Sequence, residues 1–483
     1  MFLHVLLTAV FVAFLIGVVL VILLDDGEPT RKIAWLLIIG VVPVVGFLLY
    51  MLVGLNPKHH LFFERRRRRF TDVAERSALD RLYPSDASGY IAPAWRPLAK
   101  MLARDPFEMP SGGNSIEIIT TGDRKYHLLL EDLAAAREYI HIEYFHFGND
   151  KGARDIRDML VRKAREGVKV RFLNENIGNL PIRASYYDEM KKAGVEVVRF
   201  TNPRRHLVDL ITKLNYRNHR KIVVIDGNVG YTGGMNINDK YFLRWRDTHI
   251  RLTGPAVSSL QYIFLESWIT AGGNTDLRLE QYFAPARIVP PVSETSRPEL
   301  QGQIVQVVAD EPYSPQPTLQ MSYEWALYNS KEYCYIQTPY FAPPESVLEA
   351  LKSAALSGVD VRLMLPTDSD TIMMRQVNRS YYRECLAAGV RIYERSGKFI
   401  HSKTFVSDDY LCCIGTTNVD SRSFSINYED NAYIYGREAA LQCKQIFMDD
   451  LGLSTEITMR DVMSRPWYTT LLQRIMRLFA PLL

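Results

Sequence analysis

Two histidine–lysine pairs of identical spacing stand far apart in the chain, His219-x-Lys221 and His401-x-Lys403. A histidine can attack phosphorus or carry a proton, and a neighbouring lysine supplies positive charge. Residues two apart on an extended strand share one face, so each lysine is expected to point the same way as its histidine. Together the pairs offer a nucleophile, an acid and cationic charge, which are the groups that exchange of a phosphodiester requires.

Each pair opens a longer motif, and every position of the second copy is that of the first plus 182. The further matched positions are Asp226, Gly233, Gly234 and Asn236 in the first copy and Asp408, Gly415, Thr416 and Asn418 in the second. Small residues let backbone approach an anion closely, and an asparagine amide can donate to phosphate oxygen. We therefore predict that the glycines, the threonine and the asparagines bind substrate. The aspartates lie an odd number of positions further along a strand, facing away, and we interpret them as supporting residues.

The same offset links two more carboxylates. Asp247 follows His219 by 28 residues, and Glu429 follows His401 by 28 residues. A carboxylate on one ring nitrogen fixes the tautomer of an imidazole and stabilises its protonated form. We predict that Asp247 and Glu429 orient the two histidines; the alternative is that they are ordinary surface acids.

A doubled motif of this kind predicts one active site built from two halves. One histidine would attack phosphorus and form a covalent intermediate, while the other would protonate the leaving alkoxide. The two lysines and two asparagines would hold the remaining phosphate oxygens. No metal is expected, because ammonium groups beside the histidines oppose a bound cation and no cluster of carboxylates offers ligands.

The elements around the motifs are repeated too. Strand-like runs at 138–142 and 167–171 are echoed at 332–336 and 358–362, and stretches of helical period lie between them, at 156–165 and 346–356. Strand and helix in alternation indicate an α/β sheet domain, here present twice and joined near the prolines of 282–300. A basic insertion at 201–217 breaks the symmetry and is either a lipid-phosphate contact or a plain surface loop.

The N-terminal region is apolar. Residues 1–24 and 33–55 contain no charged side chain, and each would span roughly 35 Å as a helix, enough to cross a bilayer. A cleaved signal peptide is the alternative for the first, but it lacks a basic start and a small-residue cleavage site. We predict a membrane hairpin of two helices. The arginine run at 65–69 places the remainder of the chain in the cytoplasm and suits anionic lipid headgroups.

Other features of composition exclude several classes of function. The formal net charge of +4 is too small to indicate nucleic-acid binding. The five cysteines are odd in number and have no C-x-x-C spacing, which is typical of reduced thiols rather than a disulfide framework or zinc ribbon. The last residues, 467–483, mix aromatics, leucines and two arginines, and they predict either an amphipathic interfacial helix or a core-packing one.

The paired pattern H-x-K-x4-D-x6-G-[GST]-x-N resembles the phospholipase D superfamily, and the chain is most similar to its bacterial cardiolipin synthases. The closer likeness is carried by the segments 218–222, 233–237, 245–248, 338–341 and 480–483. In that family the catalytic triads correspond to His219, Lys221, Asp226 and to His401, Lys403, Asp408. The resemblance implies that two phosphatidylglycerol molecules yield cardiolipin and glycerol through a phosphatidyl-histidine, without cofactor or metal, at the bacterial inner membrane.

We therefore expect two homologous mixed-sheet α/β domains with helices on both faces, related by a pseudo-twofold axis and preceded by the membrane hairpin. The expected boundaries are 1–56 for the hairpin, 57–110 for a basic juxtamembrane linker, and 111–290 and 291–483 for the two domains. The alternatives are a phospholipase D-type hydrolase of membrane lipids, a nuclease of the same superfamily and an inactive scaffold. The expected partners are phosphatidylglycerol and anionic lipid; nucleic acid is not expected, and no oligomeric state is assigned.

Overall fold

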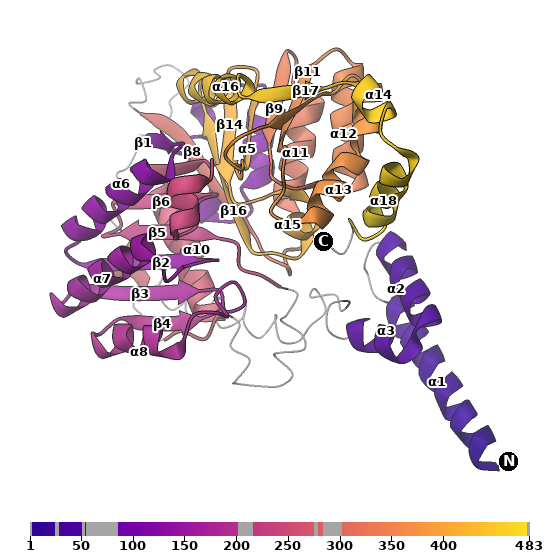
Figure 1. Cartoon of the computed structure of the whole chain (residues 1–483). Helices are drawn as coiled ribbons and strands as arrows, with labels where there is room; N and C mark the ends of the chain where they lie inside the picture. The colour runs from indigo at the N-terminus through magenta and orange to yellow at the C-terminus, as the bar shows by residue number, and fades with distance from the viewer. Residues whose placement is uncertain are drawn as a thin grey trace.

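The structure is a computed structural model, and it describes residues 2–24, 29–50, 54, 86–200, 216–274, 279–283 and 302–480. A large α/β body carries helices on both faces of one sheet, and apolar N-terminal helices project from one side of it (Figure 1). Several predicted segments lie outside the described residues: the arginine run at 65–69, most of the insertion at 201–217, nearly all of the join at 282–300, and residues 481–483.

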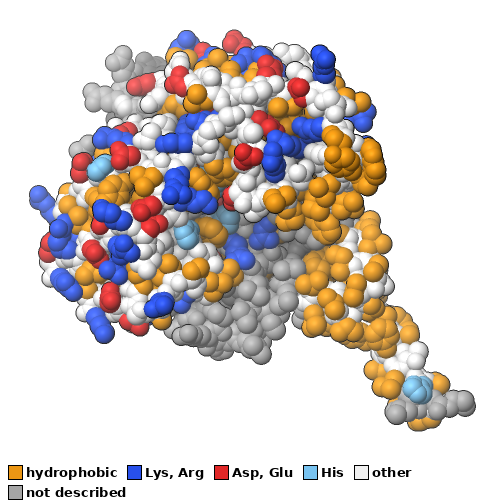
Figure 2. All heavy atoms as spheres, in the orientation of Figure 1, with side chains coloured by type: hydrophobic (Ala, Val, Ile, Leu, Met, Phe, Trp, Pro, Cys, Tyr) orange, Lys and Arg blue, Asp and Glu red, His pale blue; other side chains and the backbone are white. Residues whose placement is uncertain are grey.

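The N-terminal helices are α1 (Phe2–Leu24), α2 (Pro29–Val41) and α3 (Pro43–Leu49). Within α1, the segment His4–Leu24 is long and apolar enough to cross a membrane. Side chains of α1 and α2, among them Val18, Ile22 and Trp35, pack together in a small apolar cluster. Figure 2 shows hydrophobic side chains covering most of the visible surface of these helices.

The second apolar stretch is not one helix, so the prediction of a continuous span over 33–55 is wrong. Helix α2 ends at Val41, and α3 begins at Pro43. The ring of proline disfavours helical geometry in the residue before it, and Val42 has φ −134° and ψ 75°. At 13 residues, α2 is roughly 20 Å long, shorter than the hydrocarbon core of a bilayer.

A single 15-stranded sheet runs through the body in the order β17-β12-β11-β9-β13-β14-β16-β8-β1-β7-β6-β5-β2-β3-β4. The strands of the first half are β1 (Ser111–Ile119), β2 (Tyr139–Tyr144), β3 (Lys169–Asn174), β4 (Glu196–Arg199), β5 (Lys221–Ile225), β6 (Val229–Gly233) and β7 (His249–Thr253). Those of the second half are β8 (Gln303–Asp310), β9 (Tyr333–Gln337), β11 (Asp360–Pro366), β12 (Arg391–Arg395), β13 (Thr404–Ser407), β14 (Leu411–Gly415), β16 (Glu429–Tyr435) and β17 (Ser454–Ile457).

The two halves therefore share one sheet, and they join where β1 pairs antiparallel with β8. Outward from this junction the strands of each half follow in the same relative order, with β17 added at the outer edge of the second half. Each half is mixed: β2 is parallel to β3 and antiparallel to β5, and β9 is parallel to β11 and antiparallel to β13. A separate pair, β10 (Phe341–Ala342) and β15 (Val419–Asp420), lies outside the main sheet.

Helices cover both faces of the sheet, as the alternating pattern predicted. On one face, α10 (Val257–Thr270) and α16 (Arg437–Leu451) contribute to a core cluster that spans both halves. On the other face, α6 (Gly122–Ala135), α7 (Lys151–Arg165) and α8 (Ala184–Lys192) cover the first half. On this same face the second half is covered by α11 (Thr318–Asn329), α12 (Glu345–Leu356), α13 (Ile372–Ser380) and α14 (Tyr382–Ala387). Among the described residues of the second half there are also α15 (Ser421–Ser425), α17 (Met459–Met463) and α18 (Trp467–Arg477).

The segment before the first strand belongs to the body. Helix α5 (Arg96–Leu102) and the residues leading to it bury Ile91, Leu98 and Leu102 completely, and these side chains pack into the core of the second half. The prediction of a basic linker over 57–110 is thus wrong for residues 86–110, because their apolar side chains fill part of that core. Residues 57–85 lie outside the described residues.

Candidate active site

The two histidines lie where the halves of the chain meet, each just before a strand. The backbone N–H of His219 donates to the carbonyl of Tyr428 at 2.9 Å, and that of His401 donates to the carbonyl of Arg246 at 2.7 Å. Each bond joins one half to the other. The expectation that histidine and lysine share a strand is wrong in detail, since β5 begins only at Lys221 and β13 begins after Lys403. Each histidine lies outside the strand because its backbone N–H bonds to the other half of the chain.

The carboxylates cross between the halves. Asp247 Oδ2 lies 2.7 Å from Nδ1 of His401, and Glu429 Oε1 lies 3.6 Å from Nδ1 of His219. The 28-residue offset had linked each carboxylate to the histidine of its own copy, whereas the structure pairs it with the histidine of the other copy. Asp247 directly follows Arg246, whose carbonyl accepts from the His401 N–H. Glu429 directly follows Tyr428, whose carbonyl accepts from the His219 N–H.

Both lysines are buried beside their histidines. Lys221 Nζ and Lys403 Nζ each donate to the backbone carbonyl of the histidine two residues earlier, at 2.5 Å. Lys403 Nζ also lies 2.7 Å from Nδ1 and 3.0 Å from Nε2 of His401. Burial lowers the pKa of Lys403 to about 7 and also lowers that of Lys221, against the pull of nearby carboxylates.

The surroundings of the two histidines favour their neutral form. Burial lowers the pKa of His401 to about 4; Lys403 adds to this, and Asp247 opposes it. Burial also holds the pKa of His219 well below its usual range, assisted by the Lys221 and Arg422 charges. A phosphodiester anion would offset these cations, so binding of such an anion raises both pKa values toward protonation.

Glu429 is perturbed in the opposite sense. It is fully buried, and burial raises its pKa to about 8 although the nearby Lys221 favours its ionised form. Its distance of 3.6 Å from His219 is longer than a hydrogen bond, so this contact is looser than the one between Asp247 and His401. The two halves of the site are therefore alike in arrangement and unequal in the strength of their histidine–carboxylate contacts.

The two motif asparagines are fixed by protein partners. The amide nitrogen of Asn236 donates to the Tyr241 hydroxyl at 2.8 Å, and its oxygen accepts from the His146 N–H at 3.1 Å. The amide nitrogen of Asn418 donates to Ser423 Oγ at 3.3 Å. Each amide group has two N–H bonds, so one of these contacts leaves a second donor that can serve a ligand.

The small motif residues make room for the neighbouring strand. A Cβ on Gly234 would lie 2.1 Å from Asp247 Oδ1, and one on Gly415 would lie 1.9 Å from Asn431 Oδ1. Gly233 has φ +131°, which only glycine adopts readily, and Thr416 Oγ1 accepts from a backbone N–H at 2.9 Å. The sequence predicts that these residues approach an anion, whereas their contacts fit them to β16, which begins at Glu429, and to Asp247, which lies just before β7.

The motif aspartates bind backbone. Asp226 accepts from the N–H groups of residues 137, 138 and 139 at 2.7, 2.8 and 2.8 Å. Asp408 accepts from those of residues 331, 332 and 333 at 2.7, 3.0 and 3.0 Å. Their φ values of 50° and 51° lie in the left-handed region, which aspartate tolerates in turns. Both carboxylates tie the end of one strand to the start of another, consistent with a supporting role.

Sequence reasoning missed two arginines behind the histidines. Arg220 reaches Glu311 and donates to Ser267 Oγ at 3.0 Å, and its guanidinium lies 5.5 Å from the Tyr428 ring. Arg246 donates to Ser402 Oγ at 3.1 Å and pairs with Asp450 at 2.8 Å. For Arg220 the signal was its place as the middle residue of the first H-x-K, since alternate residues of an extended segment point to opposite sides. No comparable signal marked Arg246, because the middle residue of the second motif is Ser402.

Aromatic side chains also surround the histidines. The ring of His219 lies 4.3 Å from that of Phe145, measured between centroids, and the ring of His401 lies 5.1 Å from Trp245 and 5.4 Å from Tyr241. These rings contribute to the burial that lowers the histidine pKa values. No regular spacing in the sequence marked them.

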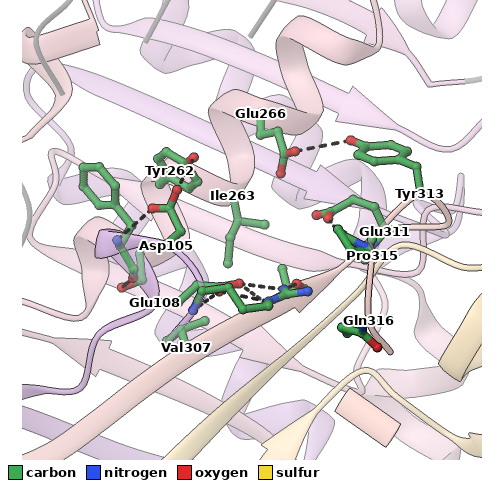
Figure 3. A pocket seen from close by; sticks show the side chains of 15 residues that line it. Asp105, Glu108, Tyr262, Ile263, Glu266, Val307, Glu311, Tyr313, Pro315 and Gln316 are labelled. Atoms are coloured by element: carbon green, nitrogen blue, oxygen red, sulfur yellow. Dashed lines mark hydrogen bonds and ion pairs between the residues drawn. The ribbon is translucent and has the colours of Figure 1, made fainter. Parts of the chain in front are cut away.

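Arg220 also contacts Glu266 and Glu311, two of the residues that line a cavity of about 430 Å³ (Figure 3). The carboxylates of Glu266 and Glu311 and the Tyr313 hydroxyl face one another there, with Glu266 bonded to Tyr313 at 3.2 Å. Burial, together with the Glu311 charge, raises the pKa of Glu266 well above its usual range, opposed by Arg220. Glu266 and Glu311, which line this cavity, thus help to hold Arg220 of the first motif in place.

No group of three or more histidine, cysteine, aspartate or glutamate side chains that could hold a metal ion occurs within the described ranges. The five cysteines are all buried and free. The ionisable groups beside the histidines include the two lysines, the two crossed carboxylates and Arg422.

Three comparisons relate this site to known proteins. The family model "Cardiolipin synthase, PLD-like domain" matches residues 129–268 and 325–451, and "Phospholipase_D-nuclease N-terminal" matches 11–54. The chain is 37% identical over 477 residues to a cardiolipin synthase of Geobacillus kaustophilus, covering 97% of this chain and 92% of that protein. It is 35% identical over 487 residues to one of Alkalihalophilus pseudofirmus, covering 99% and 94%.

Among solved structures, phosphatidylserine synthase of Haemophilus influenzae aligns with a TM-score of 0.58 at 14% identity, covering 76% of this chain and 95% of that one. At this identity the likeness concerns the fold alone. The family models cover more than half of the chain, and the curated relatives match nearly its full length. The chain therefore belongs to the bacterial cardiolipin synthases of the phospholipase D superfamily.

Proposed function

We propose that the chain is a membrane phosphatidyltransferase that makes cardiolipin and glycerol from two phosphatidylglycerol molecules. The names of its relatives support this activity. One observation carries the mechanism: the two histidines are each bonded through their backbone to the opposite half, and each faces a carboxylate of that half. Neither half has a complete site without the other.

In the proposed reaction His219 is the nucleophile. Its side chain is 23% exposed, against 10% for His401, and it makes the looser carboxylate contact. A ring nitrogen of His219 attacks phosphorus, the bond from phosphorus to the glycerol oxygen breaks, and a phosphatidyl-histidine forms. His401, held by Asp247, donates its proton to the departing glycerol oxygen.

The second step reverses the first with a new alcohol. His401 takes the proton from a glycerol hydroxyl of another phosphatidylglycerol, whose oxygen attacks phosphorus and releases His219. Lys221 and Lys403 offset the charge that develops on the phosphate oxygens, and Asn236 and Asn418 are proposed to donate to the same oxygens. No metal or cofactor enters either step.

We also propose how the chain sits in the cell. Helix α1, together with α2 and α3, forms a multi-pass anchor in the bacterial inner membrane. The basic residues that follow place the catalytic body in the cytoplasm. The matched strand order and the crossed contacts at the histidines support a pseudo-twofold relation between the halves. The domain boundaries at 111 and 290 belong to the same proposal, and β1 begins at Ser111.

The test uses the full chain, purified in detergent, with phosphatidylglycerol labelled in its headgroup glycerol and in its acyl chains. The expected products are labelled cardiolipin and free glycerol in equal amounts. Phosphatidic acid as the main product would instead identify a hydrolase, in which water is the acceptor, and would overturn the transferase assignment.

Two variants then test the roles of the histidines. His219→Ala and His401→Ala should each abolish product while the protein stays folded and membrane-bound. In a rapid quench with neutral denaturant, which preserves the acid-labile phosphorus–nitrogen bond, the phosphatidyl adduct should map to His219. Substantial activity in either variant contradicts the two-half mechanism, and an adduct on His401 reverses the assignment of nucleophile.

A further inference from the structure

The C-terminal helix α18 presents its apolar face to the outside. Its exposed side chains include Trp467, exposed by 76%, Leu471 by 48% and Ile475 by 42%, and the residues beyond it include Leu478, exposed by 72%. Within α18 the buried residue is Gln473. An amphipathic helix on the surface of a soluble protein has the reverse orientation, with its apolar side toward the core.

Specific contacts fix this orientation. The amide of Gln473 donates to Gln376 of α13 at 3.3 Å, and Arg477 of α18 donates to Glu384 of α14 at 2.5 Å. The Arg477 guanidinium lies 4.1 Å from the centre of the Tyr381 ring. The polar side of α18 is therefore bound to the body, and its leucines and aromatics are left facing outward.

A basic cavity of about 670 Å³ lies where α18 meets α13, α14 and α17. Arg379, Arg383, Arg474 and Arg477 line it, together with a single carboxylate, Glu384. Arg379 pairs with Glu394 at 2.6 Å, and Arg477 pairs with Glu384. Across the part of the chain that is described, Arg383 and Arg474 form no ion pair, so the cavity has unbalanced positive charge beside an apolar face.

This surface faces the N-terminal helices and borders the active site. In Figure 1, α18 lies on the side of the body from which α2 extends, and Figure 2 shows hydrophobic side chains on both. At the start of α13, Ile372 is 81% exposed. Two residues earlier, Asp370 accepts from the Tyr340 hydroxyl at 2.7 Å, and the Tyr340 ring lies 6.3 Å from that of His401.

We propose that α18 and the start of α13 dock on an anionic lipid bilayer, and that the arginine cavity binds the phosphate group of a lipid at a site separate from the catalytic histidines. The exposed leucines and aromatics insert among the lipid chains, and Arg383 and Arg474 pair with headgroup phosphate. The bilayer is the occupant because α1 anchors the body on this side. Docking brings Asp370 and Tyr340, which connect the start of α13 with His401, toward the membrane, where both substrates reside.

The test measures the depth of α18 in the full chain, reconstituted in nanodiscs. Because the native cysteines are buried, Leu471→Cys can carry a single spin label, and Leu441→Cys, on the exposed side of α16, is the matched control. In nanodiscs of phosphatidylglycerol, the label at 471 should be more accessible to oxygen than to a water-soluble nickel reagent. The label at 441 should show the opposite. Equal, water-like accessibility at both positions overturns the proposal.

Lipid charge and the arginines are tested with the same label. Nanodiscs of neutral phosphatidylcholine should give at least a threefold lower ratio of oxygen to nickel accessibility at 471, and adding inorganic phosphate to them should not restore it. The double variant Arg383→Gln/Arg474→Gln should remove the difference between the two lipids. Restoration by free phosphate, or an unchanged difference in the variant, contradicts the lipid site.

A second copy of the chain is the other possible occupant of this face. Broadening between spin labels at 471 on two copies would indicate that occupant and overturn membrane docking. This inference rests on membrane attachment but not on phosphatidyl transfer, and label depth is measured without turnover. Failure of the docking proposal is thus separable from failure of the proposed reaction.

Discussion

Replacing Asp247 with asparagine should reduce kcat by a large factor. Asp247 Oδ2 lies 2.7 Å from Nδ1 of His401, and both side chains are buried. Asparagine keeps the shape but removes the charge that stabilises the imidazolium formed during proton transfer. Removing one partner of a buried ion pair costs about 3–5 kcal/mol. At about 1.4 kcal/mol per factor of ten, kcat should fall about 10²- to 10⁴-fold, with little change in KM.

The matched change in the other half, Glu429→Gln, should cost much less. Glu429 lies 3.6 Å from His219, beyond hydrogen-bond length, and its pKa of about 8 means that it is mostly protonated at pH 7. Glutamine closely mimics a neutral carboxyl group. We expect a loss of about 1 kcal/mol, or less than about tenfold in kcat.

Both variants are measured by cardiolipin formation in detergent, at saturating substrate and pH 7. Asp123→Asn, a change on the exposed first turn of α6, serves as the control and should have wild-type activity. The reasoning is refuted if Glu429→Gln is impaired as much as Asp247→Asn, or if Asp247→Asn retains more than a tenth of wild-type kcat.

Four further predictions concern packing, support, pH and metal. Gly234→Ala should mimic Asp247→Asn in the same assay, because its Cβ would lie 2.1 Å from the Asp247 carboxylate, whereas Gly452→Ala, whose nearest atom is 3.4 Å away, should be neutral. Asp226→Asn should lower the free energy of unfolding by about 1–3 kcal/mol, measured by denaturation in detergent, but change kcat per folded molecule less than threefold; a larger fall in kcat would make it catalytic. Burial raises the pKa of Glu108 from 4.5 to about 7, so between pH 4.5 and about 7 the unfolded chain binds fewer protons than the folded one. The free energy of unfolding should therefore fall by up to about 3 kcal/mol as pH rises through this range. Glu108→Gln should flatten this part of the plot of unfolding free energy against pH, and an unchanged slope would contradict the assignment. EDTA should leave cardiolipin formation unchanged, and loss of activity restored by added metal would contradict a reaction carried by histidine and lysine alone.

Much of the site could be predicted because the repeat is visible in the sequence. A fixed offset picks out the same residue types twice, and alternation along a strand predicted that Asp226 faces away from the histidine. The pairing of Asp247 with His401 could not be predicted, because spacing within one copy says nothing about how two copies meet. The strand junction between β1 and β8 decides that, and it depends on contacts between residues about 190 positions apart.

Some elements of the fold could be predicted from the sequence and others could not. Repeated strand and helix patterns indicated the mixed sheet and its covering helices, since both periodicities are local. The break between α2 and α3 could have been predicted from Pro43, which interrupts an otherwise apolar run. The burial of residues 86–110 could not, because the partners of their apolar side chains lie far along the sequence, in the second half of the chain.

The two arginines behind the histidines restrict which substitutions the two halves can accept independently. On the His219 side the arginine is the middle residue of the motif, Arg220, and it lies against Tyr428. On the His401 side the middle residue is Ser402, and the arginine is Arg246, which occupies the repeat position of Tyr428. Each side thus has one guanidinium, supplied from a different position. Because the contacts cross, position 220 is matched to position 428 and position 402 to position 246. Placing an arginine at position 428 or 402 without changing its partner would therefore put two guanidinium groups on one side, and removing Arg220 or Arg246 alone would leave that side with neither.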